Sequence, residues 1–255
     1  MSPRTLLEIL DNQVAVVTLN RPDKYNGLDM EMFDSIVKTA KLIKKNKKIR
    51  GVILKGEGKV FSSGLDVKRV TKSPASVLKL LFKPGRKISN LAQDVSYIWR
   101  QLPVPVIAVT HGMCYGGAFQ IALGADFRYS TPDCEFSIME GKWGLIPDMS
   151  GSITLRELIP VDVAKELTMT ARIFNGIEAK ELGLVTRISE TPYEEALAFF
   201  NEIESKSPEA IAYAKQLFNT TRTVSDKVAL DTETKLQTQL IKKKILNLDN
   251  LKALL

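Results

Sequence analysis

Histidine and cysteine are scarce in this chain of 255 residues, which holds one histidine and two cysteines. A catalytic triad that relies on histidine would have to use His111. A zinc site with three or four ligands is hard to assemble from His111, Cys114 and Cys134. Acid–base chemistry is therefore expected to use carboxylates, amides or tyrosines.

Long apolar runs are also absent, since no stretch approaches the roughly 18 apolar residues that cross a membrane. The start of the chain has no apolar core behind basic residues, as a secretory signal would have. Two cysteines without such a signal favour reduced thiols over a disulfide, and a cytoplasmic location is expected. Hydrophobic residues make up 44% of the chain and charged residues 25%, which indicates a folded globular protein.

Positive charge is in excess, with 36 Lys and Arg against 29 Asp and Glu, a net +7. Residues 38–50 are rich in lysine and contain no acid, and a second basic run covers 242–244. Solvated helix faces are the favoured interpretation, with attraction of an anionic small ligand or of nucleic acid as alternatives. No aromatic RNA-binding motif or helix-turn-helix pattern accompanies the lysines, so a nucleic-acid partner is not expected.

Strand-like and helix-like segments alternate through the first two-thirds of the chain, which predicts an α/β fold with a mostly parallel sheet. The runs at 6–9 and 14–19 predict a hairpin. Further strands are expected at 52–54, 104–109, 126–130 and 184–188. Helices are expected at 30–48, 88–102, 114–123, 152–158, 161–170, 177–182, 193–205, 210–221 and 226–246. Residues 71–87 are interpreted as a surface loop with one short helix, a mobile lid being the alternative.

Two turns rich in small residues follow expected buried strands, at residues 61–66 and 115–118. Glycines there allow the backbone to approach a ligand closely and leave N–H groups free to bind it. Two such turns at the ends of parallel strands could direct two N–H donors at one oxygen, which would form an oxyanion hole.

Two acids, Glu140 and Asp148, lie in a loop broken by glycine and proline. Burial among the apolar residues of that loop (Trp143, Leu145 and Ile146) is expected to raise the pKa of either acid, which suits a proton shuttle. Taken singly, each acid is also explained as a helix cap or a surface carboxylate.

Five segments in order resemble the crotonase superfamily, the enoyl-CoA hydratases and isomerases. They are NRPDKYNGL at 20–28, FSSGLD at 61–66, YGGAF at 115–119, EFSIMEGKWGLIPDMSG at 135–151 and ARIFNGIEAKELGLV at 171–185. The resemblance implies a ββα spiral core over residues 1–190 for acyl-CoA binding and catalysis. It also implies a C-terminal helical trimerisation region over 191–255, with a homotrimer or a dimer of trimers as the assembly.

The resemblance further implies that the N–H groups of Leu65 and Gly117 form the oxyanion hole for a thioester enolate. It implies contacts to coenzyme A from Lys24, Tyr25, Gly27, Ser63, Gly64, Asp66 and Gly116. No metal and no tightly bound cofactor is expected, since coenzyme A enters as part of the acyl-CoA substrate. Its roughly four phosphate charges would suit the basic excess.

Gln120 occupies the position at which hydratases of this family carry the first of two glutamates, and Glu140 matches the second. An amide cannot exchange a proton at neutral pH, so hydration by two carboxylates is disfavoured. Δ3,Δ2-enoyl-CoA isomerases use a single glutamate, and Asp148 matches an acid that dienoyl-CoA isomerases add. We therefore predict a double-bond isomerase of fatty acyl-CoA thioesters that uses Glu140. The alternatives are a hydratase with Gln120 in place of the first glutamate, another crotonase reaction, or a non-catalytic acyl-CoA-binding protein.

Overall fold

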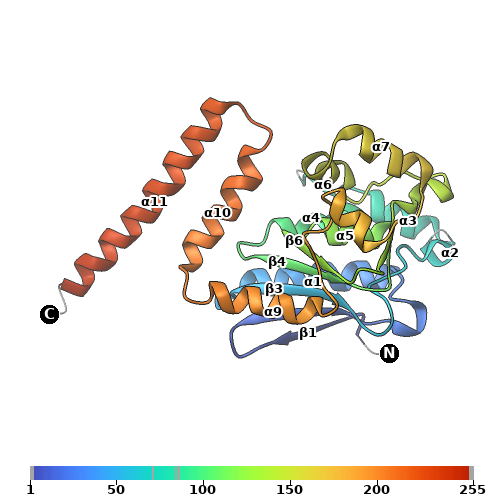
Figure 1. The fold of residues 1–255 in the computed structure, drawn as a ribbon, viewed down its shortest axis with the longest axis horizontal. Helices are drawn as coiled ribbons and strands as arrows, with labels where there is room; N and C mark the ends of the chain where they lie inside the picture. The colour runs from blue at the N-terminus through green and yellow to red at the C-terminus, as the bar shows by residue number, and fades with distance from the viewer. Residues whose placement is uncertain (1–2, 71, 84, 86, 253–255) are drawn as a thin grey trace. The chain divides into compact units, whose positions relative to one another are not determined.

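The computed structural model describes residues 3–70, 72–83, 85 and 87–252. The chain divides into two compact units, one of Met1–Leu102 with Val106–Glu204 and one of Pro103–Pro105 with Ser205–Leu255. The division at residue 190 that the resemblance implies stays a prediction. Figure 1 follows the elements along the chain.

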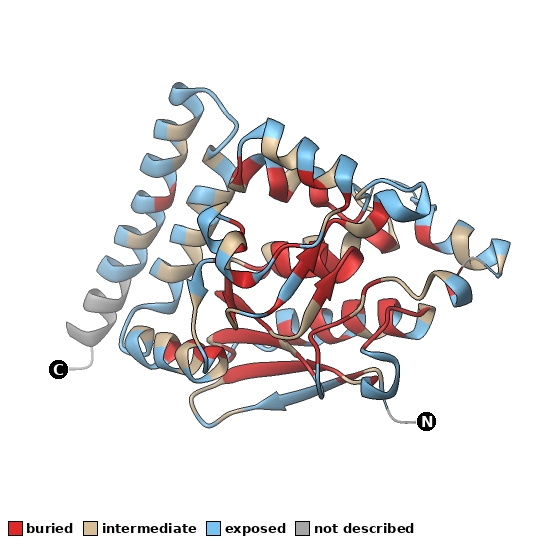
Figure 2. Ribbon diagram, turned by 45° about the vertical axis from the view of Figure 1, so that its right-hand side comes forward, coloured by how far each residue is buried: buried red, intermediate tan, exposed pale blue. Residues whose placement is uncertain are grey.

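A six-stranded sheet forms the centre of the first unit, in the order β1-β2-β3-β4-β6-β8. Its strands are β1 (Thr5–Ile9), β2 (Val14–Leu19), β3 (Gly51–Gly56), β4 (Val106–Thr110), β6 (Phe127–Ser130) and β8 (Arg187–Ile188). The hairpin β1–β2 is antiparallel and every other pairing in this sheet is parallel, as the sequence predicts. Figure 2 shows β2, a wholly buried strand, beside the exposed edge strand β1.

A second sheet of two parallel strands was not anticipated from the sequence. It pairs β5 (Met113–Tyr115) with β7 (Glu135–Ser137), and α5 (Gly117–Leu123) follows β5 directly. The expected helix at 114–123 is therefore wrong at its start. Strands of three residues are too short to show a hydrophobic period, which is why the pattern gave no sign of them.

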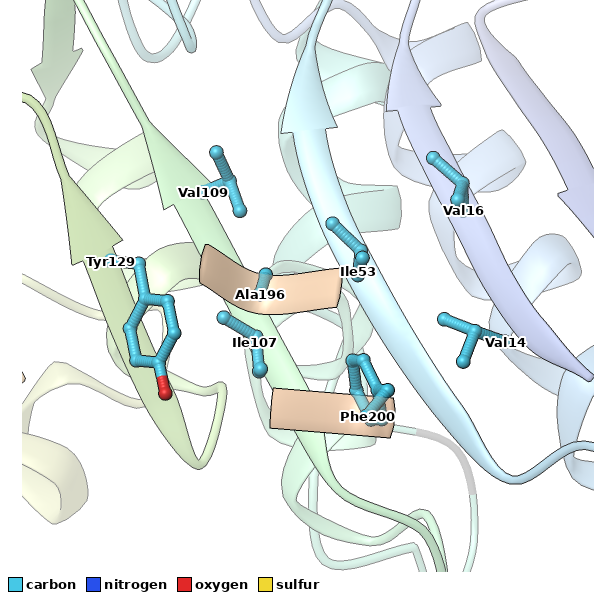
Figure 3. Close-up of a cluster of buried hydrophobic side chains, with 8 residues drawn as sticks. All are labelled: Val14, Val16, Ile53, Ile107, Val109, Tyr129, Ala196 and Phe200. Atoms are coloured by element: carbon cyan, nitrogen blue, oxygen red, sulfur yellow. The ribbon is translucent and has the colours of Figure 1, made fainter. Parts of the chain in front are cut away.

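Helices cover both faces of the central sheet. On one face, Phe200 and Ala196 of α9 (Pro192–Ile203) pack on side chains from four strands, as Figure 3 shows. Parallel register brings those side chains together, since Ile53 pairs with both Val16 and Ile107. The opposite face packs against α1 (Met30–Lys45) and α5.

Helix α1 begins where Asp29 caps it, with the carboxylate accepting a hydrogen bond from Met32 N at 2.9 Å. The remaining helices of the first unit are α2 (Val67–Val70), α3 (Pro74–Leu81), α4 (Leu91–Arg100), α6 (Gly151–Leu158), α7 (Val161–Thr170) and α8 (Gly176–Glu181). Two short 3-10 helices are η1 (Pro22–Lys24) and η2 (Met139–Trp143).

The second unit is a pair of helices, α10 (Pro208–Thr221) and α11 (Asp226–Lys252), which pack against each other. The sequence predicts both. Across the described part of the chain, no helix is both long enough and apolar enough to traverse a bilayer.

Candidate active site

The two glycine turns predicted from the sequence lie side by side. Ser62 pairs with Cys114 in a parallel bridge, in which Ser62 N donates to Met113 O at 2.9 Å. A Cβ atom on Gly64 would lie 2.5 Å from Tyr115 O and 3.7 Å from Gly117 N. Gly64 also has a φ of +86°. Only glycine combines this backbone conformation with such a close approach of the two turns.

The backbone N–H groups of Leu65 and Gly117 are free of protein acceptors in the described part of the chain. Leu65 is flanked by two bonds to Leu28, which donates to Gly64 O at 2.8 Å and accepts from Asp66 N at 3.1 Å. Gly117 opens α5, and the first N–H groups of a helix have no partner within it. Both groups can therefore bind an oxygen of a ligand.

Arg21 holds the turn that carries Leu65, a role that motif matching did not find. This buried guanidinium donates through Nη1 to Gly27 O at 3.0 Å and to Asp66 Oδ2 at 2.9 Å. It thereby ties the loop after β2 to the residue that follows Leu65. The signal in the sequence was an arginine two residues after a predicted strand. The segment around it was interpreted only through its backbone contacts to a ligand.

Asn26 is a second positioning residue that the sequence interpretation left without a role. It is fully buried, and its Nδ2 donates to the carbonyl oxygens of Glu57, Val60 and Phe61 at 2.9, 2.9 and 3.1 Å. Its φ is +53°, a conformation that asparagine tolerates better than most residues. Asn26 therefore fixes the loop between β2 and α1 against the loop that follows β3.

The side chains of Gln120 and Glu140 form a direct pair. Gln120 Nε2 donates to Glu140 Oε1 at 2.6 Å. The other end of the amide, Gln120 Oε1, accepts from the backbone N–H groups of Met149 at 2.8 Å and Gly151 at 3.0 Å. Two donors therefore fix which end of the amide is the oxygen, and the NH₂ end must face Glu140.

Glu140 has one carboxylate oxygen occupied and one available. The residue is 8% exposed, and its Oε2 is buried without a hydrogen-bond partner. A Cβ atom on Gly116 would lie 3.4 Å from Glu140 Oε1, so the carboxylate lies against the turn that carries Gly117. Burial raises the pKa of Glu140 and the charge of Asp148 adds to that, while the hydrogen bond from Gln120 opposes it.

Asp148 lies in an exposed stretch of the same loop. Partial desolvation by the surrounding protein still raises the pKa of its carboxyl. The apolar residues expected to enclose the two acids do not do so, because Trp143, Leu145 and Ile146 are exposed. Glu140 is buried instead by contact with the Gly116 turn and with Gln120 of α5.

The residues predicted to contact coenzyme A, apart from Gly116, lie in two adjacent segments. The loop at 24–27 lies beside the turn at 63–66, since Ser63 N donates to Tyr25 O at 2.9 Å. Lys24 and Tyr25 are exposed at the surface of this loop. Contact with coenzyme A remains a prediction for all of them: Lys24, Tyr25, Gly27, Ser63, Gly64, Asp66 and Gly116.

Comparison with known proteins gives consistent matches over most of the chain. The family model described as enoyl-CoA hydratase/isomerase matches residues 10–250. The peroxisomal Delta(3,5)-Delta(2,4)-dienoyl-CoA isomerase of Arabidopsis thaliana is 31% identical over 87% of this chain and 82% of its own length. The mitochondrial methylglutaconyl-CoA hydratase of Mus musculus is 30% identical over 84% of this chain and 68% of its own.

Among solved structures, the enoyl-CoA hydratase from Bacillus anthracis superposes with a TM-score of 0.85 at 27% identity. The superposition covers 98% of this chain and 96% of that one. The likeness therefore extends to the whole fold.

Proposed function

The chain belongs to the enoyl-CoA hydratase/isomerase family, and on that premise we propose that it isomerises a double bond in acyl-CoA thioesters. Glu140 is the proton shuttle of this proposed reaction. The observation that carries the proposal is the fixed Gln120–Glu140 pair, which leaves one carboxylate oxygen free and places an amide rather than an acid at position 120.

The proposed reaction begins when Glu140 Oε2 removes a proton from the α-carbon of a 3-enoyl thioester. The electrons of the broken C–H bond delocalise through the carbonyl group onto the thioester oxygen and through the double bond onto the γ-carbon, which gives a dienolate. The same carboxyl then returns the proton to the γ-carbon, and the double bond becomes conjugated with the thioester. Atoms and charge balance without a further reactant, so a single carboxyl that reaches both carbons is sufficient.

The N–H groups of Leu65 and Gly117 would stabilise the dienolate. Negative charge on the thioester oxygen is larger in the dienolate than in the substrate, so two fixed donors stabilise it selectively. Two observations support this assignment: both N–H groups are free of protein acceptors in the described part of the chain, and a Cβ atom added to Gly64 would lie 3.7 Å from Gly117 N, so the two turns lie close together.

Hydration is the less favoured alternative because water addition in this family calls on two carboxylates. The orientation of Gln120, with its NH₂ end toward Glu140, supplies a hydrogen bond and no exchangeable acid. Asp148 is close enough for its charge to raise the pKa of Glu140 and is proposed as a second proton site for dienoyl substrates.

Substrate and assembly are proposed along with the reaction. Coenzyme A would bind along the loop at 24–27 and the turn at 63–66 as part of the fatty acyl thioester. The chain would form a homotrimer or a dimer of trimers through its C-terminal helices.

A cytoplasmic location is supported by Cys114 and Cys134, which are both buried and free, as is usual in reducing compartments.

A paired assay tests the reaction, with 2-enoyl-, 3-enoyl- and 3,5-dienoyl-CoA supplied separately. Isomerisation creates the absorbance of a conjugated thioester from 3-enoyl-CoA, whereas hydration removes that absorbance from 2-enoyl-CoA. We expect the gain of absorbance from 3-enoyl-CoA to be at least about tenfold faster than the loss of absorbance from 2-enoyl-CoA. Faster loss of absorbance from 2-enoyl-CoA would favour a hydratase instead.

Glu140→Gln is the matched variant for this assay, since it keeps the shape of the side chain and removes the base. Its turnover should fall by at least about 100-fold. An unchanged rate would reject Glu140 as the shuttle. If no thioester turns over while coenzyme A raises the unfolding temperature, the non-catalytic binding alternative is correct.

A further inference from the structure

A groove in the first unit lies outside the candidate active site. It runs between α1, the end of α3 and the start of α4, with a volume of about 560 Å³ (Figure 1 labels the three helices). We call it the lysine groove and define it by Lys38, Lys41, Lys45 and Lys87 with the apolar Leu42 and Phe82. The proposed isomerisation gives it no role.

The outer face of α1 forms one wall of the lysine groove. Its lysines, Lys38, Lys41 and Lys45, follow a spacing of three and four residues and therefore line up on one side of the helix. Leu42 lies within the same row and is 50% exposed. Within the described residues, none of these lysines forms an ion pair, so the row keeps its full positive charge.

The opposite wall comes from α3, from Phe82 and from residues 87–91. Phe82 is 60% exposed there, and Lys87 adds a further positive charge. Lys79 Nζ lies 2.7 Å from Asp34 Oδ2, an exposed ion pair that links α3 to α1. Leu42 and Phe82 therefore add exposed apolar surface between the lysines, which distinguishes the groove from a purely polar, solvated helix face.

We propose that the lysine groove binds an amphipathic α-helix of a partner protein, with acidic residues along one edge and apolar residues beside them. Lys38, Lys41, Leu42 and Lys45 have the spacing i, i+3, i+4 and i+7, so they lie along one side of α1, where a second helix can pack. Carboxylates along one edge of that helix would face the lysines, while its apolar stripe would cover Leu42 and Phe82. Opposite charges steer the encounter and set the register.

Two other polyanions fit the groove less well. A nucleic-acid backbone gains little from an apolar floor, and the carboxylates of Asp34 and Asp94 in the lining repel a continuous row of phosphates. A flat anionic membrane does not reach into a recess between three helices. A helix can place neutral residues opposite the two acids and insert its apolar side chains.

Binding of a synthetic peptide to the full-length protein tests the proposal. The probe is a fluorescein-labelled amphipathic helix of about 18 residues, with glutamates along one edge and leucines beside them, read by fluorescence anisotropy. A scrambled peptide of the same composition is the control for charge alone. We expect the amphipathic peptide to bind at least about tenfold more tightly, and its affinity to fall as salt rises.

Variants on α1 distinguish binding in the lysine groove from nonspecific attraction to a basic surface. Lys41→Glu should weaken binding of the amphipathic peptide by at least about tenfold, and Leu42→Gln by a smaller factor. Lys44→Glu is the matched control, because Lys44 is exposed on the same helix but does not line the groove. Circular dichroism establishes that each variant is folded.

Three results would overturn the proposal. One is equal affinity for the scrambled and the amphipathic peptide, and another is equal weakening by Lys44→Glu. The third is binding of a poly-uridine RNA or of phosphatidylserine vesicles through Lys41 and Lys45 while the amphipathic peptide fails to bind.

Discussion

Burial and two neighbouring side chains act on the carboxyl of Glu140. Burial and the charge of Asp148 raise its pKa, and the amide of Gln120 lowers it by a hydrogen bond of 2.6 Å. A base whose pKa is raised accepts a proton more readily, and a pKa near the working pH keeps both the carboxylate and the carboxylic acid accessible during turnover. The acidity of Glu140 is thus set by residues that do not themselves need to react.

The pH profile of isomerisation should report these opposing effects. The carboxylate is the active form of Glu140, so kcat/KM falls as the pH drops through its pKa, which lies above the usual 4.5. Gln120→Met removes the hydrogen bond that favours the carboxylate, so the acidic limb should move to higher pH. Asp148→Asn removes a neighbouring negative charge, so the limb should move to lower pH. Shifts in the same direction in both variants would contradict the assignment.

The protonation of Glu140 should also affect the free energy of unfolding of the protein. The folded state raises the pKa of Glu140, so it binds the proton more tightly than the unfolded chain does. The free energy of unfolding therefore falls as the pH rises through the folded-state pKa. Glu140→Gln should be more stable than the parent at pH 7, by about 1 kcal/mol, with a smaller difference near pH 4. Urea unfolding at both pH values measures this, and a less stable variant at pH 7 would contradict it.

At the scale of elements, the candidate site depends on two turns that the fold holds together. The bridge between Ser62 and Cys114 aligns the two turns. The ion pair of Arg21 with Asp66, at 2.9 Å, fixes the turn at 61–66. Neither turn alone could place two N–H donors around one oxygen.

Gly64→Ala should separate the two donors. The new Cβ atom would lie 2.5 Å from Tyr115 O, a backbone atom, so one turn must shift. We expect turnover to fall by at least about 100-fold, as for loss of an oxyanion donor. Gly85→Ala is the matched control, since Gly85 also has a positive φ (+59°) but has no atom within 4 Å of the added Cβ. Equal turnover in the two variants would show that the contact between the turns does not matter.

At the scale of the whole molecule, the surface of the second unit bears on the proposed assembly. The helix pair of the second unit exposes large apolar side chains along both helices, Phe218 on α10 being 73% exposed and Leu230 and Ile245 on α11 also exposed. Apolar residues in this number on two packed helices are typical of an interface. Since the chain mass is 28.4 kDa, a monomer, a trimer and a dimer of trimers differ clearly in mass.

Light scattering should give about three or six times the chain mass. Phe218→Glu should lower that mass, because it places a charge within the proposed interface. Gln216→Glu adds the same charge at an exposed polar position of α10 and should leave the mass unchanged. A monomeric parent protein at micromolar concentration would contradict assembly through these helices.

The sequence by itself determined the elements and the chemistry available to them. Periodicity predicted α1, the hairpin β1–β2 and the C-terminal helices because each is long enough to show its period. The scarcity of histidine directed attention to carboxylates, and the ordered motifs indicated Leu65, Gly117, Gln120 and Glu140. The family match over residues 10–250 confirms the resemblance on which those residues were chosen.

Only the tertiary structure decided how those residues meet. The three-residue strands β5 and β7 and the buried Asn26 carry no local signal, because their partners lie far away in the chain. The pattern of apolar letters around Glu140 suggested the wrong source of burial, since Trp143 and Ile146 point to solvent and the Gly116 turn encloses the acid. The orientation of Gln120 depends on the backbone N–H groups of Met149 and Gly151, which the fold alone brings to its oxygen. Such contacts are long-range and directional, whereas a sequence pattern records only local preference and spacing.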